Sequence, residues 1–224
     1  MKTILSTLVL LVLTAVSADA VQDLESAESA FRSAAVSGTK SKRTSALNAL
    51  IALGDPDAVP TLTTEYARVS VIVRDARDDA YRAKYAFERV SDLIKSMELR
   101  AERDPGLKQP ISRQREKQRK FQEEMESAFE KVASNTPWRD EIGDGVRRLF
   151  EAIPKKRKKA EGAIWDSAEE EEQLEVRLAS IELLGVVGGD GSASRLQKLL
   201  FSELASQAKI KRSLAILLKH IYHV

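Results

Sequence analysis

The stretch from Val69 to Ala101 reads VSVIVRDARDDAYRAKYAFERVSDLIKSMELRA. Its apolar residues recur at alternating steps of four and three, a mean spacing of about 3.5 residues. This spacing predicts a single helix about 50 Å long whose apolar side chains form the seam of a coiled coil. The seam residues are Val69, Val73, Ala76, Ala80, Ala83, Phe87, Val90, Ile94, Met97 and Ala101.

A second stretch with the same rhythm follows, and it mirrors the first across Asp104-Pro105-Gly106-Leu107-Lys108-Gln109-Pro110. Its seam residues are Gln118, Phe121, Met125, Ala128 and Val132. The residue numbers of Ile94 and Phe121 add up to 215, and so do those of Val90 and Met125. An antiparallel pair of helices requires this symmetry, so the sequence predicts a hairpin over residues 69–134 with its turn at 104–110. The alternative is one long solvated helix that buries its seam elsewhere.

The composition predicts an all-α protein. Hydrophobic residues make up 43% of the chain, aromatic residues 5% and charged residues 31%, with 10 Gly and 6 Pro. Ala, Leu, Glu, Lys and Arg dominate, and these are strong helix formers. The chain has 36 basic and 34 acidic residues, for a net charge of +2. That balance argues against a bulk polyanion as the partner and leaves room for local charged patches.

Residues 1–20 have the pattern of an export signal. Lys2 supplies the positive start, Ile4 to Val16 is an apolar run, and Ala18-Asp19-Ala20 is an A-x-A cleavage pattern. The run is shorter than the roughly 20 apolar residues of a membrane span, so we expect cleavage near Ala20 and a periplasmic or extracellular protein. No later stretch is long and apolar enough for a stable span. The chain contains no Cys, so it must hold together without disulfides.

Residues 43–66 combine an arginine, small residues, a leucine stripe, the turn Gly54-Asp55-Pro56 and the motif Ala-Val-Pro-x-Leu. Gly54 suits the left-handed conformation that ends a helix, and Pro56 suits the first turn of the next helix. The pattern recurs 134 residues later, over residues 177–204, with Gly188-Gly189-Asp190-Gly191 at the turn. The equivalent pairs are Arg43 and Arg177, Ala46 and Ser180, Leu47 and Ile181, Leu50 and Leu184, Leu53 and Val187, Gly54 and Gly188, Val59 and Ala193, and Leu62 and Leu196.

Both segments resemble HEAT repeat units, and a weaker third start lies at Arg212. The resemblance implies an α-solenoid body, in which helix pairs bury their apolar faces against neighbouring pairs. With its export signal, the chain resembles an exported bacterial-type HEAT-repeat protein. The alternative is an ordinary helical bundle with the same turn chemistry.

Together these features predict an all-α chain with a HEAT-like helical repeat body and an inserted long antiparallel coiled-coil hairpin. The export signal covers residues 1–20, N-terminal HEAT-like helices 21–68, the hairpin 69–134 and a C-terminal HEAT-like region 135–224. We expect this last region to open with a new helix at Thr136-Pro137, because Thr is a good N-cap and Pro fits the first helical position.

Basic residues gather on both sides of the predicted turn. They are Arg100, Arg103, Lys108, Arg113, Arg115, Lys117, Arg119 and Lys120, and Glu116 stands among the later ones. A basic tip of this kind is suited to an anionic surface, such as lipid headgroups, a polyanionic glycan or nucleic acid. It has no aromatic residue on which bases would stack, which weighs against nucleic acid. The alternative is a tip whose charges serve only solubility.

The sequence contains no arrangement typical of catalysis. The absence of Cys excludes thiolate chemistry, and His220 and His223 have no acidic residue nearby to complete a metal site. Phosphate-binding glycine loops and nucleophile motifs are also missing. We therefore predict no catalytic, cofactor-binding or metal-binding residues, and no cofactor.

Three hypotheses follow for the function. The first is an exported, non-enzymatic scaffold that binds protein partners through its helix faces, including a C-terminal strip of Leu217, Leu218 and Ile221. The second is a binder of anionic surfaces through the basic tip. The third is a helical enzyme or metal protein, and the absence of a catalytic or metal-binding arrangement in the sequence disfavours it.

Overall fold

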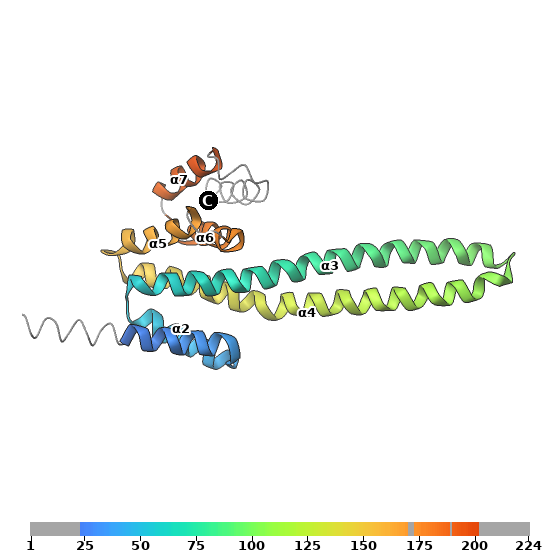
Figure 1. Cartoon of the computed structure of the whole chain (residues 1–224), viewed down its shortest axis with the longest axis horizontal. Coiled ribbons are helices and arrows are strands. Elements are labelled where there is room, and N and C mark those ends of the chain that lie inside the picture. Colours follow the sequence, from blue (N-terminus) through green and yellow to red (C-terminus); the bar gives the residue numbers. More distant parts are fainter. Residues whose placement is uncertain (1–22, 170–172, 189, 202–224) are drawn as a thin grey trace, which may run out of the picture. The chain divides into compact units, whose positions relative to one another are not determined.

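The computed structural model describes residues 23–169, 173–188 and 190–201, and over these residues the protein is all-α, with no strand (Figure 1). This confirms the all-α class predicted from the composition. Residues 23–37 form the first helix. The elements that follow are α2 (Lys40–Ala52), the 3-10 helix η1 (Pro56–Ala58), α3 (Val59–Ala101), the 3-10 helix η2 (Pro105–Leu107), α4 (Lys108–Ala152), α5 (Arg157–Glu169), α6 (Leu174–Val187) and α7 (Asp190–Phe201).

The chain divides into two compact units. One consists of residues 69–139 and is called here the two-helix unit, because it contains most of α3 and α4. The other consists of the residues up to Arg68 and from Asp140 onward, and is called the larger unit.

Helix α2 of the larger unit begins and ends at recognisable signals. The Thr39 side chain accepts a hydrogen bond from the backbone N–H of Lys42, which caps the start of the helix. Gly54 follows the helix with a φ of 60°, the left-handed conformation predicted for it. Asp55 then accepts a hydrogen bond from the backbone N–H of Asp57 and starts η1.

The core of the larger unit is mainly aliphatic. Its largest fully buried side chains are Phe31, Leu47, Leu50, Leu62, Ile142, Leu149, Ile164, Ile181, Leu183, Leu184 and Leu196. Gly145 in α4 lets α2 approach closely, because a Cβ at this position would lie only 2.8 Å from Cδ1 of Ile51 and 3.2 Å from Cδ1 of Leu47. The last described helices are also tied together, since Arg195 in α7 binds both carboxylate oxygens of Glu169 in α5, at 2.9 and 2.8 Å.

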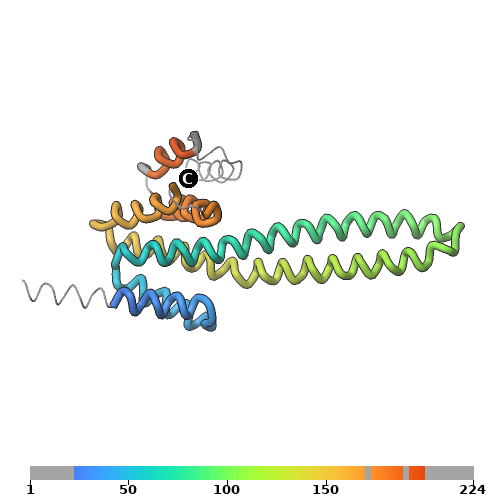
Figure 2. Tube along the Cα trace, in the orientation of Figure 1, coloured from blue at the N-terminus to red at the C-terminus, as the bar shows by residue number. Residues whose placement is uncertain are grey.

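In the two-helix unit α3 and α4 lie side by side and run in opposite directions, as the trace in Figure 2 shows. The chain reverses over residues 102–107, where the Asp104 side chain accepts a hydrogen bond from the backbone N–H of Gly106 at 2.9 Å. Two side-chain hydrogen bonds join the helices: Gln118 Nε2 donates to Ser91 Oγ at 2.8 Å, and Arg115 donates to Glu98 at 2.7 Å. The turn is shorter than the predicted 104–110, since α4 already begins at Lys108.

Buried side chains in the two-helix unit lie along one stripe of each helix. Val73, Ala76, Ala80, Ala83 and Ile94 are the buried residues of α3 beyond Val69. In α4 the buried residues of this unit are Ile111, Ala128 and Trp138. Phe87, Val90, Met97, Phe121 and Met125 are partly exposed. Small alanines therefore fill much of the space between the helices.

The predicted new helix at Thr136-Pro137 is wrong, because α4 runs without a break from Lys108 to Ala152 with Pro137 inside it. Proline in a helix interior removes a backbone hydrogen bond. The two side chains just before Pro137 bond to carbonyls of the preceding turn. Asn135 Nδ2 donates to the carbonyl of Lys131 at 2.9 Å, and Thr136 Oγ1 to that of Val132 at 2.7 Å. Thr136 is thus a residue within the helix rather than its cap.

Pro137→Ala is expected to raise the free energy of unfolding of α4 by about 1 to 3 kcal/mol. Alanine restores the missing backbone donor and has a helix propensity roughly 3 kcal/mol better than proline. Hydrogen exchange of the amides of residues 130–142 measures the change, because slower exchange reports fewer openings. Equal or faster exchange in the variant would show that Pro137 does not weaken the helix.

Candidate functional site

The eight basic residues of the predicted tip lie next to the chain reversal or on the first turns of α4. Arg100 is in the last turn of α3, and its carbonyl accepts hydrogen bonds from the backbone N–H groups of Arg103 and Asp104. Lys108 is the first residue of α4, and the remaining five follow it on that helix. They extend over about 20 Å, since a helix rises about 1.5 Å per residue.

Three of these basic residues have acidic partners. Arg115 binds Glu98 of α3 at 2.7 Å, Arg119 lies 3.7 Å from Glu123, and Lys120 lies 3.9 Å from Glu124. All three pairs are exposed, where such ion pairs contribute little to stability. The Arg115 pair differs from the others because it connects the two helices.

The other five basic side chains form no ion pair with any residue that the structure describes. They are Arg100, Arg103, Lys108, Arg113 and Lys117, and all five are exposed. Arg113 and Lys117 line a shallow groove together with Glu116 and Glu123, so the surface there carries both signs of charge. Arg100, Arg103 and Lys108 lie nearest the turn, where Glu102 and Asp104 are also exposed.

Exposed aromatic side chains form a second feature of the two-helix unit. Tyr81 and Tyr85 are 69% and 64% exposed and lie one turn apart on α3, while Phe129 is half exposed on α4. The guanidinium of Arg89 lies 5.8 Å from the centre of the Tyr85 ring. The seam pattern does not include these residues. The four-residue spacing of the two tyrosines outside the seam places them on one face of the helix, and this could have identified them from the sequence.

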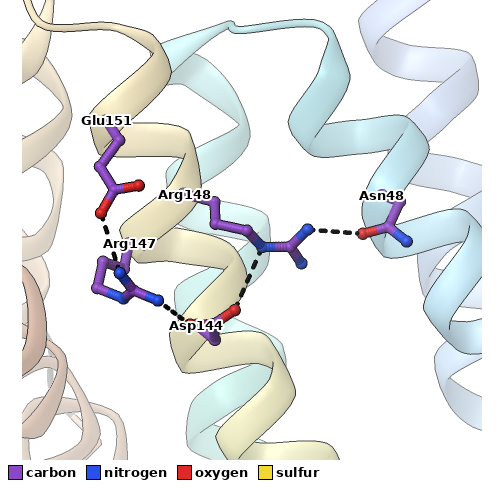
Figure 3. Close-up of polar contacts among 5 residues, drawn as sticks. All are labelled: Asn48, Asp144, Arg147, Arg148 and Glu151. Atoms are coloured by element: carbon purple, nitrogen blue, oxygen red, sulfur yellow. Dashed lines mark hydrogen bonds and ion pairs between the residues drawn. The ribbon is translucent and has the colours of Figure 1, made fainter.

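The larger unit holds a polar network between α2 and α4 (Figure 3). Arg147 binds Asp144 and Glu151, and the pKa of Arg147 is raised, chiefly by its hydrogen bond to Asp144. Arg148 lies 3.3 Å from the same aspartate and donates to Asn48 of α2 at 3.0 Å. The network joins α2 to α4, and both of its acidic groups, Asp144 and Glu151, are held in ion pairs.

Two residues of the basic run from Lys155 to Lys159 make contacts within the larger unit. Residues 154–156 form a turn and α5 begins at Arg157, whose guanidinium donates to the carbonyl of Val187 at 2.7 Å. The ammonium group of Lys159 binds both carboxylate oxygens of Asp57, at 2.7 and 2.9 Å. The hydrogen bond to Asp57 raises the pKa of Lys159. Two of the five cations are therefore structural contacts.

Among the described residues, no three His, Cys, Asp or Glu side chains are grouped to hold a metal ion. None of the described helices is both long and apolar enough to cross a membrane. The export signal, both histidines and the strip of Leu217, Leu218 and Ile221 lie outside the described residues.

Comparison with protein-family models, with curated proteins and with solved structures finds no match for this chain.

Proposed function

We propose that this chain is an exported, non-enzymatic scaffold protein that binds protein partners through a coiled-coil hairpin attached to a HEAT-like helical body. The hairpin corresponds to the two-helix unit and the body to the larger unit. Export depends on the signal pattern of residues 1–20, and a chain without Cys is compatible with an oxidising compartment.

The position of the buried residues supports the coiled coil. The residues of α3 that are buried in the two-helix unit all belong to the stripe spaced by four and three, and the remaining stripe residues are partly exposed. Glu98 and Arg115 flank this stripe on the two helices, where antiparallel coiled coils carry cross-helix ion pairs.

Equivalent burial supports the repeat body. Helix α2 spans residues 40–52, and α6 spans residues 174–187, so the two nearly coincide after a shift of 134. Leu47 and Ile181 are both fully buried, and so are Leu50 and Leu184. The turns differ, because Gly54 has a φ of 60° whereas Gly188 is extended. The two helices share the buried apolar stripe that a repeat unit requires, and they differ in the conformation of the turn that follows.

The observation that carries the binding role is the exposure of Tyr81, Tyr85 and Phe129 on the two-helix unit. Aromatic side chains, above all tyrosine and tryptophan, contribute much of the binding energy in protein interfaces. A protein partner that covers these three rings gains their apolar area.

The test is cross-linking of the full-length protein in its native extract, followed by mass spectrometry. Partners should cross-link to residues 69–139 of the unaltered protein and be lost from a variant with Tyr81→Ser, Tyr85→Ser and Phe129→Ser. Leu99→Ser, which changes an exposed leucine on the same unit, is the matched control and should keep the partners. If the triple variant retains every partner, or if all cross-links lie outside the two-helix unit, the proposed role of the hairpin is wrong.

The unpaired cations near the turn favour a second candidate, a binder of anionic surfaces. Arg113→Glu with Lys117→Glu should abolish salt-sensitive binding to vesicles containing phosphatidylserine, because both cations are unpaired. Arg119→Glu with Lys120→Glu is the comparison, since these two have acidic neighbours and should matter less. Heparin and DNA are parallel arms that identify the kind of anion. No binding of the unaltered protein to any of the three would exclude this function.

A further inference from the structure

A groove runs along one side of the two-helix unit, beside the stripe of buried residues. Its apolar floor includes Ala83, Ala86, Phe121 and Ala128. Its rim carries acidic and basic side chains in equal number: Asp79, Glu123, Glu124, Arg82, Lys120 and Lys131. A groove with an apolar floor and a rim of both charges is suited to another helix with the same features.

The residues along the α3 side of this groove follow one another at intervals of seven. In the heptad whose a and d positions are the seam, Asp79, Ala86, Leu93 and Arg100 occupy the g position. The g positions of a two-stranded coiled coil are usually charged. Here the two central ones are apolar, and Leu93 is 44% exposed. An apolar stripe that widens from a and d to include g is typical of a helix that packs on more than one neighbour.

The order of these four residues is self-complementary. If a second α3 runs antiparallel to the first, Asp79 faces Arg100 of the other copy, and Ala86 faces Leu93. The first pair joins opposite charges, and the second fits a large side chain against a small one. Helix α4 is self-complementary in the same way. Glu124 and Lys131 occupy successive g positions, so Glu124 of one copy faces Lys131 of the other when two α4 helices run antiparallel.

A single two-fold axis can relate the two α3 helices and the two α4 helices at the same time. It passes α3 between Arg89 and Val90 and α4 between Ser127 and Ala128. These points lie within about one helical turn of the same level, given the register in which Glu98 lies beside Arg115. One symmetric contact therefore uses the groove, Leu93 and the charged rim at once, as a contact between identical surfaces must.

We propose that two copies of this chain associate through this face, so that their two-helix units form an antiparallel four-helix bundle. Asp79 and Glu124 already have neighbours on their own helices, Arg82 at 3.7 Å and Lys120 at 3.9 Å. Those pairs are exposed and weak, so exchanging them for contacts with the second copy costs little. The inference depends on the proposed hairpin and is independent of export and of the HEAT-like body.

The test measures the mass of the full-length protein by sedimentation over a range of concentrations. We expect a dimer. Lys131→Glu should weaken it at least tenfold, because each of the two Glu124–Lys131 contacts becomes a repulsion, and Glu124→Lys alone should do the same. The double variant Glu124→Lys with Lys131→Glu should recover the original affinity, since the charges have only changed places. Glu130→Lys, an exposed charge reversal with no place in the groove, is the control and should have no effect.

Leu93→Glu provides an independent variant at an exposed position, so the two-helix unit itself should remain folded while the dimer is lost. A protein that is monomeric at every concentration overturns the inference, and so does a dimer that tolerates Lys131→Glu. Cross-links from the groove only to a helix of another protein would also overturn it. A monomer that still binds partners through Tyr81 and Tyr85 would leave the proposed function standing, so the two failures are distinguishable.

Discussion

Leu50→Ala is expected to lower the free energy of unfolding of the larger unit by about 3 kcal/mol. Leu50 lies in α2 and is 0% exposed. Truncation removes apolar contacts and leaves a cavity that the surrounding helices only partly fill, which typically costs about 2 to 5 kcal/mol. Leu184→Ala, at the equivalent position of α6, should cost about the same, because that side chain is also fully buried.

Urea unfolding measures this loss, with Trp165 as the reporter of the larger unit. The chain has two tryptophans, so a Trp138→Phe background leaves Trp165 as the only one. Leu53→Ala is the matched control, because Leu53 is 41% exposed and its truncation should cost below about 1 kcal/mol. Similar losses for Leu50→Ala and Leu53→Ala would contradict the core described here. A small loss for Leu184→Ala alone would count against the proposed equivalence of the segments that contain Leu50 and Leu184.

Ile94→Asp is expected to separate α3 from α4 in the two-helix unit. Ile94 is 6% exposed, so its replacement either removes a carboxylate from water without a partner or forces the helices apart. We expect a loss of about 3 to 4 kcal/mol in the local stability of residues 69–139. That loss corresponds to amide hydrogen exchange roughly a hundredfold faster or more, since about 1.4 kcal/mol is a factor of ten.

Leu99→Asp is the control for this substitution, because it introduces the same charge on α3 at a side chain that is 74% exposed. Exchange in that variant should stay close to that of the unaltered protein. Amides of the larger unit should keep their protection in both variants, because the two units have separate cores. Uniform loss of protection throughout the chain after Ile94→Asp would mean that the units do not unfold separately.

Local signals in the sequence predicted much of the fold. The high content of helix formers gave the correct all-α class, and Gly54 has the left-handed φ predicted from the turn that follows it. Helix formation and the conformation of Gly54 both depend on residues only a few positions away. Such short-range preferences can be recognised directly in a sequence.

The continuous course of α4 was not predictable from the same kind of signal. Thr136 and Pro137 are typical of a helix start, yet here they lie inside a long helix. Packing on both sides of the proline outweighs the local preference, since tertiary contacts routinely override propensity. The hydrogen bonds from the Thr136 and Asn135 side chains to the carbonyls of Val132 and Lys131 show that both residues lie within the helix.

The candidate surfaces were predicted only in part. The sequence located the basic residues near the turn, but it did not separate Arg115, which binds Glu98, from Arg113 and Lys117, which have no acidic partner among the described residues. Long-range contacts such as the one between Arg148 and Asn48 leave no periodic trace, because they depend on how distant helices approach each other.

In the proposed hairpin the two long helices pair in the register that sets Ile94 against Phe121. A chain without Cys allows a direct measurement with Ile94→Cys and Phe121→Cys. A disulfide requires Cα atoms within about 7 Å, so oxidation should join these two positions within one chain. Ile94→Cys with Ala128→Cys shifts one partner by about 10 Å along the helix and should stay reduced. If the shifted pair closes as readily, or if the first pair forms disulfides only between chains, the proposed hairpin is wrong.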